Sequence, residues 1–69
     1  MKKYKVKCYN KSGDLDHEEF CDMLAQAETI RKNWGLKIGL RPEPSMDFAK
    51  YPTIWVLSNN GEWKRVEGY

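Results

Sequence analysis

The most reactive side chains of this chain belong to two cysteines, Cys8 and Cys21, and one histidine, His17. His17 lies in the acidic segment DLDHEE, directly after Asp16 and two positions before Glu19. Sulfur, imidazole and carboxylate groups together are ligands that bind transition metals. However, no Cys-x-x-Cys or His-x-x-x-His spacing is present, and neighbouring residues of a strand point to opposite faces. We therefore predict that these groups diverge and that the chain has no metal site.

The same residues offer one possible nucleophile and base, Cys8 with His17. A reactive cysteine needs an electropositive, partly exposed environment, whereas Cys8 falls on the apolar side of a predicted strand. The five glycines each lie at a predicted turn or chain end, so no glycine-rich phosphate loop or nucleophile turn is present. We therefore expect no catalytic residue, no cofactor and no enzymatic activity. The thiols are expected to stay free, because the predicted strand pairing holds them too far apart for a disulfide.

The tryptophans point to binding rather than catalysis. Trp55 and Trp63 lie eight residues apart in the segment TIWVLSNNGEWKRV, which is typical of one hairpin. Large aromatic and basic side chains together are the types found at binding hot spots. A chain this short also needs its large apolar side chains for a core, so the pattern leaves both roles open. The candidate binding residues are Trp55, Leu57, Trp63, Arg65, Lys64 and Tyr9.

The chain has 69 residues, which allow one small domain, 1–69, with a thin margin of stability. Its net charge of +2 at pH 7 says little by itself about partners. No apolar run approaches the roughly 20 residues that cross a bilayer, and the lysine-rich N-terminus has no apolar signal region. We therefore expect a cytoplasmic protein without membrane contact.

The charges are segregated along the chain. Residues 1–11 contain five lysines and no acid, and residues 12–30 contain six acids and no lysine or arginine. The lysines could form a phosphate-binding strip. Alternatively, cross-strand ion pairs account for the pattern, with Lys5 facing Glu19. We favour the ion pairs, because the acids lie where strand pairing needs them.

The C-terminal segment predicts a hairpin with strands near 53–57 and 62–66. Its turn is either a two-residue Asn60-Gly61 loop or a three-residue loop with Gly61 in the left-handed conformation as a bulge. We favour the bulge, because it gathers like side chains on each face. It places Ile54, Val56 and Val66 on one face and Trp55, Leu57, Trp63 and Arg65 on the other.

The N-terminal segment predicts a second hairpin. Residues 3–9 alternate lysines with apolar side chains, the pattern of a half-buried strand. The triplet Lys11-Ser12-Gly13 predicts the same bulged turn, followed by a weaker strand near 15–21. In this register Cys8 faces Asp16.

One helix is predicted between the hairpins. Asp22 is a suitable N-cap and Gly35 a suitable C-cap. The residues that recur at helical spacing as a buried stripe are Leu24, Ala27, Ile30 and Trp34. The connection over 36–51 contains apolar residues through Phe48, so we expect it to pack against the domain, with one short turn at 46–48.

These elements predict an α+β domain of ββαββ order, with an antiparallel sheet of two hairpins and one helix packed on it. If the second strand fails, the order becomes βαββ. The function predicted first is a non-enzymatic module that binds a protein partner, or itself as a homodimer, through the aromatic hairpin face. The alternative is a single-stranded nucleic-acid binder, in which bases stack on Trp55 and Trp63 while lysines contact phosphates.

Overall fold

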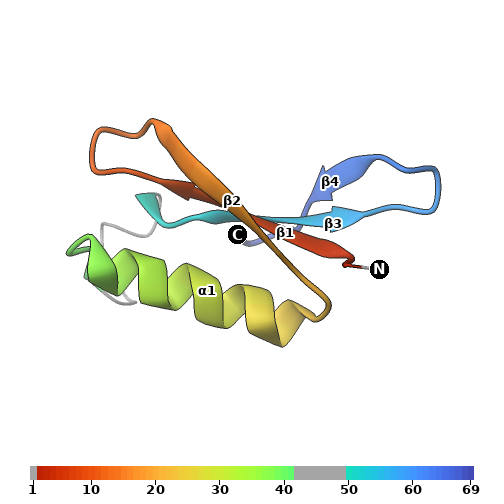
Figure 1. The fold of residues 1–69 in the computed structure, drawn as a ribbon, viewed down its shortest axis with the longest axis horizontal. Coiled ribbons are helices and arrows are strands. Elements are labelled where there is room, and N and C mark those ends of the chain that lie inside the picture. The colour runs from red at the N-terminus through yellow and green to blue at the C-terminus, as the bar shows by residue number, and fades with distance from the viewer. Residues whose placement is uncertain (1, 42–49) are drawn as a thin grey trace.

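The structure is a computed structural model that describes residues 2–41 and 50–69. It confirms the predicted α+β domain with ββαββ order (Figure 1). The elements are β1 (Tyr4–Tyr9), β2 (Leu15–Cys21), α1 (Leu24–Lys37), β3 (Thr53–Leu57) and β4 (Trp63–Arg65).

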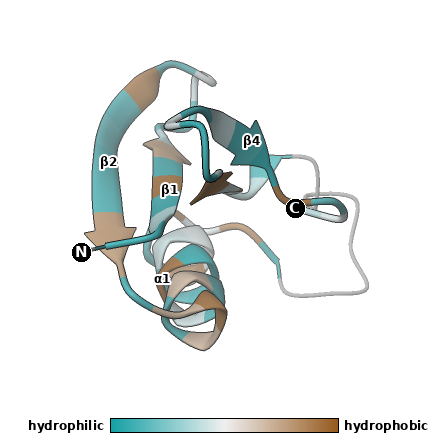
Figure 2. Ribbon diagram, turned by 90° about the vertical axis from the view of Figure 1, so that its right-hand side faces the viewer, coloured by the Kyte–Doolittle hydropathy of each residue, from teal (hydrophilic) through white to brown (hydrophobic). Residues whose placement is uncertain are grey.

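The four strands form one antiparallel sheet in the order β2-β1-β3-β4, so the two hairpins join through the central pair β1 and β3. Val6 of β1 lies opposite Ile54 of β3, and both side chains are fully buried. Helix α1 packs on one face of this sheet (Figure 1). Strand β1 alternates hydrophilic and hydrophobic residues, whereas the middle of β2 is hydrophilic throughout, as the colours along the two strands show in Figure 2.

The C-terminal hairpin has the predicted bulged turn. Gly61 has a φ of +84°, and its N–H donates to the carbonyl oxygen of Ser58 at 3.0 Å. The Ser58 N–H donates in turn to the carbonyl oxygen of Glu62 at 2.8 Å, which leaves three residues in the loop. Leu57 therefore lies opposite Trp63, and the predicted division of side chains between the two faces is confirmed.

The N-terminal hairpin begins with the same turn but pairs differently. Gly13 has a φ of +89°, and Tyr9 lies opposite Leu15 as predicted. A second irregularity follows, because Cys8 lies opposite His17 and Asp16 is left without a partner in the ladder. This β-bulge adds one residue to β2 and shifts every later pair by one.

The register predicted beyond this bulge was therefore wrong. Cys8 faces His17 rather than Asp16, and Lys5 faces Phe20 rather than Glu19. A bulge within a strand requires no glycine or proline, so the sequence carries no local signal that would have indicated it.

Helix α1 begins one residue later than predicted, with Met23 rather than Asp22 as its N-cap. The side-chain oxygen of Gln26 accepts hydrogen bonds from the N–H groups of Asp22 and Met23, both at 3.1 Å. A glutamine at the third helical position can satisfy backbone donors that precede the first turn. The first turn of the helix therefore forms without a capping hydrogen bond from the Asp22 side chain.

The helix also ends later than predicted, because Gly35 is an internal residue and Gly39 follows the C-cap. Gly39 has a φ of +87°, and the N–H of Leu40 donates to the carbonyl oxygen of Gly35 at 2.7 Å, the bonding pattern of a Schellman motif. Gly35 instead lies against the ring of Tyr51, which a Cβ atom at that position would overlap.

The core lies between the sheet and α1. Its buried residues include Val6, Cys8, Cys21, Ala27 and Ile54, and the predicted helix residues Leu24, Ile30 and Trp34 pack against them. Both cysteines are free thiols, as predicted. The short turn predicted at 46–48, and half of the connection expected to pack against the domain (residues 42–49), fall outside the described residues.

Candidate functional site

The face of the sheet opposite α1, which we call the open face, carries aromatic and basic side chains. By strand alternation and pairing it comprises Lys3, Lys5, Lys7, Tyr9, Leu15, Glu18, Phe20, Thr53, Trp55, Leu57, Trp63 and Arg65. Within residues 2–41 and 50–69, no helix or second sheet layer packs on this face. It brings together two aromatic residues of the C-terminal hairpin and three lysines of the N-terminal strand.

Lysine side chains lie over both tryptophan rings of the open face. The Nζ of Lys5 is 4.6 Å from the centre of the Trp63 ring, and the Nζ of Lys7 is 4.4 Å from the centre of the Trp55 ring. Phe20 adds a third ring, whose centre is 5.9 Å from that of Trp63. Both tryptophan rings are half-buried, and the side chain of Lys5 is only 12% exposed.

Hydrogen bonds hold the Trp55 ring in place. The indole N–H of Trp55 donates to the hydroxyl of Thr53 at 2.9 Å, and the hydroxyls of Thr53 and Tyr9 are 3.1 Å apart. These bonds connect β1 with β3 beside the ring. The Trp55 side chain is therefore oriented before any partner binds.

The open face is basic. Lys3, Lys7 and Arg65 share it with Lys5, whose Nζ lies 3.7 Å from the Glu18 carboxylate. The predicted pairing of Lys5 with Glu19 was wrong, because the bulge places Glu19 on the face that α1 covers. Lys5 therefore forms a cross-strand ion pair, as expected, but with Glu18 rather than Glu19.

Five of the six predicted binding residues lie on the open face: Tyr9, Trp55, Leu57, Trp63 and Arg65. Lys64 does not, because it lies opposite Val56 and points to the other side of the sheet. The prediction missed Phe20, which is 46% exposed. Its place beside Trp63 depends on the shifted register of β2, and the sequence did not indicate that shift.

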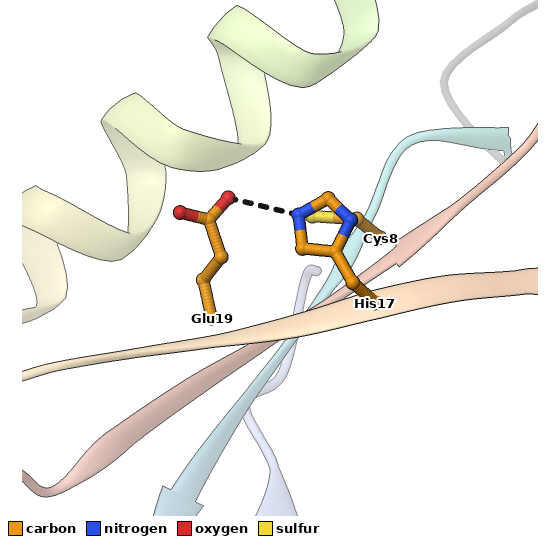
Figure 3. Close-up of side chains that lie close together, drawn as sticks. All are labelled: Cys8, His17 and Glu19. Atoms are coloured by element: carbon orange, nitrogen blue, oxygen red, sulfur yellow. Dashed lines mark hydrogen bonds and ion pairs between the residues drawn. The ribbon is translucent and has the colours of Figure 1, made fainter.

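A second group of chemically active side chains lies on the opposite face, beside α1. The Sγ of Cys8, a ring nitrogen of His17 and a carboxylate oxygen of Glu19 lie within 4.8 Å of one another (Figure 3). The prediction that these groups diverge was wrong. His17 and Glu19 are two positions apart and share a face of β2, and the bulge places Cys8 directly opposite His17.

The His17 ring is held on several sides. Its Nδ1 is 2.6 Å from the Asp16 carboxylate, and its Nε2 is 3.2 Å from the Glu19 carboxylate. The Trp34 ring packs edge-on against it, with centres 4.8 Å apart. The indole N–H of Trp34 donates to the carbonyl oxygen of Tyr9 at 2.7 Å, which fixes this contact to β1.

The electrostatic surroundings of this cluster raise the pKa values of both Cys8 and His17. Burial, followed by the nearby carboxylates of Glu19 and Asp16, raises the pKa of Cys8 to about 12. Hydrogen bonds to Asp16 and then to Glu19 raise the pKa of His17. A cysteine in this state is a poor nucleophile, so the pair does not resemble an activated thiol.

No protein-family model, no curated protein and no solved structure matches this chain. Within the described ranges, helix α1 is too short and too polar to cross a membrane. Any assignment of function to this chain therefore rests on the geometry of its two sheet faces.

Proposed function

We propose that the open face binds single-stranded nucleic acid. The observation that supports this proposal is the alternation of tryptophan rings with lysine ammonium groups on a sheet face that no helix or second layer of the described residues covers. Single-strand binding surfaces combine aromatic platforms for bases with cations that contact the backbone. Trp55 and Trp63 would stack bases, while Lys5, Lys7 and Arg65 would contact phosphates.

The lysines over the rings do not block this role, as the magnitudes show. A cation over an aromatic ring contributes roughly 0.5–1 kcal/mol at exposed sites and about 2 kcal/mol when desolvated, and the half-buried rings fall between these limits. Stacking of a base on an aromatic side chain contributes about 1–3 kcal/mol. A base can therefore displace Lys7 from the Trp55 ring, and the displaced ammonium group then meets the phosphate beside that base.

A protein partner, or a second copy of the chain, is the second candidate. Phe20 favours it, since an exposed ring beside Trp63 extends the apolar area. The central lysines favour nucleic acid, because protein interfaces are depleted of lysine.

The proposal is tested by fluorescence anisotropy with labelled oligo-dT and oligo-U over a range of salt concentrations. We expect binding that weakens as salt rises, because each neutralised phosphate contributes about −0.7 to the slope of log K against log salt. Lys7→Gln should make that slope shallower by about 0.7, the contribution of one phosphate contact. Lys64→Gln makes the same charge change on the opposite face and should leave the slope nearly unchanged.

The ring is tested by Trp63→Leu, which keeps an apolar side chain but removes the stacking surface. The affinity should fall by about 5- to 150-fold, the equivalent of about 1–3 kcal/mol. Circular dichroism checks that the fold is retained. Absence of salt-dependent binding to either oligonucleotide would overturn the proposal, and salt-insensitive self-association lost in Trp63→Leu would support the second candidate instead.

A further inference from the structure

We infer that Cys8, His17 and Glu19 form a binding site for a divalent transition metal, with zinc the best match to these ligands. The ligand atoms come from two adjacent strands and converge on the side of the sheet that faces α1 (Figure 3). Thiolate, imidazole and carboxylate are the three groups that bind zinc in proteins. This site lies on the opposite face from the proposed nucleic-acid surface, so the two proposals can fail separately.

The distances are close to those that a bound metal requires. Bond lengths of about 2.0–2.3 Å in tetrahedral geometry place neighbouring ligand atoms about 3.5 Å apart. The Nε2 of His17 and the Oε2 of Glu19 are already 3.2 Å apart, and each pair in the cluster is within 4.8 Å. The Glu19 side chain is 45% exposed and can adjust by rotation, without movement of the strands.

The second observation that points to a metal is the support of His17. Histidines that bind metals almost always donate their other ring N–H to a carboxylate or a carbonyl oxygen, which fixes the tautomer and the ring orientation. Asp16 occupies this position, with its carboxylate 2.6 Å from Nδ1. The β-bulge at Asp16 thus does two things: it brings His17 opposite Cys8, and it places a carboxylate behind the ring.

Three protein ligands leave a tetrahedral metal with one open position, which is the arrangement of catalytic or bridging zinc rather than of a closed structural site. A shallow pocket beside His17 and Glu19 lies where that position could be reached, and its other walls come from α1 through Ile30, Asn33, Trp34 and Lys37. A water molecule is the simplest fourth ligand.

The experiment uses the full reduced chain, freed of metal with a chelator and titrated with Co²⁺. We expect a thiolate-to-cobalt charge-transfer band and intense visible bands that saturate at one metal per chain, and that disappear when Zn²⁺ is added. Cys8→Ser should abolish the charge-transfer band. The matched control is Cys21→Ser, which removes the other buried thiol and should leave the band unchanged.

His17→Gln and Glu19→Gln keep the inference testable if Cys8→Ser does not fold, because both side chains are partly exposed. Each should weaken cobalt binding by at least about 10-fold, and Asp16→Asn, behind the ring, should weaken it by about 10- to 100-fold. Zinc should raise the melting temperature of the unchanged chain and leave that of His17→Gln unaltered. The inference is overturned if no band appears at one equivalent, or if the band survives both His17→Gln and Glu19→Gln.

Discussion

In both hairpins a three-residue loop ends in a glycine at positive φ, with Gly13 at +89° and Gly61 at +84°. Two backbone hydrogen bonds close each loop. In the N-terminal hairpin the N–H of Asn10 donates to the carbonyl oxygen of Asp14, and the N–H of Gly13 donates to that of Asn10. In the C-terminal hairpin Ser58 donates to Glu62, and Gly61 donates to Ser58, in the same way. Beyond the turn they differ. The C-terminal hairpin continues as a regular ladder, whereas the N-terminal hairpin has a bulge between the pairs Tyr9–Leu15 and Cys8–His17.

This difference determines which side chains lie on each face of the sheet. The regular ladder keeps Trp55, Trp63 and Arg65 in alternation on the open face. The bulged strand instead turns His17 and Glu19 towards α1, and leaves Phe20 beside the tryptophans. The C-terminal hairpin therefore contributes its aromatic side chains to the open face alone, whereas the N-terminal hairpin, with one extra residue, contributes to both faces.

The largest effect is expected where the two hairpins join. Ile54→Ala removes a fully buried side chain opposite Val6 and should reduce the free energy of unfolding by about 2–5 kcal/mol in urea denaturation. Leu15→Ala, at a position 53% exposed in the N-terminal hairpin, is the control and should stay within about 0.5 kcal/mol. A loss below about 1 kcal/mol for Ile54→Ala would show that the hairpins do not depend on this contact.

The likeness of the two turns is tested by Gly13→Val and Gly61→Val. Each should cost more than about 1 kcal/mol, because a β-branched residue is strained at positive φ. No atom lies within 4 Å of a Cβ built at either glycine, so the cost is one of backbone conformation alone. Asparagine, which tolerates this conformation, should recover part of the loss at both positions. Unequal losses would mean that the turns are less alike than their hydrogen bonds indicate.

The difference between the hairpins is tested by deleting Asp16, the unpaired residue of the bulge. The pairs Tyr9–Leu15 and Cys8–His17 can then form in one regular ladder, so we expect stability to change by no more than about 1 kcal/mol. Deleting Glu18 from the regular part of β2 should be far more damaging, because it turns the residues on one side of it to the wrong face. Amide hydrogen exchange measures both variants, and similar losses in the two would contradict the bulge.

The parts of the fold that were predictable are those with a local cause. Glycine at positive φ determines both turns, and alternation then determines which residues share a face of the C-terminal hairpin. The helix followed from the spacing of Leu24, Ala27, Ile30 and Trp34. For the same reason, four of the six proposed binding residues, Trp55, Leu57, Trp63 and Arg65, could be placed on one face of this hairpin from the sequence.

The parts that were not predictable depend on contacts between distant segments. Gly35 resembles a helix terminator, but it allows α1 to approach Tyr51. Arg31 resembles a surface residue near the end of a helix, yet it is 8% exposed and its Nε donates to the carbonyl oxygen of Pro52 at 3.1 Å. The Cys8–His17–Glu19 cluster depends on a bulge without sequence signal. In each case the deciding neighbour is not adjacent in the chain.

The central position of β1 and β3 also has a consequence for the order of folding. Each hairpin joins its strands across a short loop, and isolated hairpins form in about 1–10 μs. Joining β1 to β3 brings together residues such as Tyr9 and Thr53, which are 44 positions apart. Closing that long loop costs conformational entropy before the contacts between the two strands stabilise the chain. We expect this docking to limit the folding rate. In stopped-flow measurements, Ile54→Val should then slow refolding more than it accelerates unfolding.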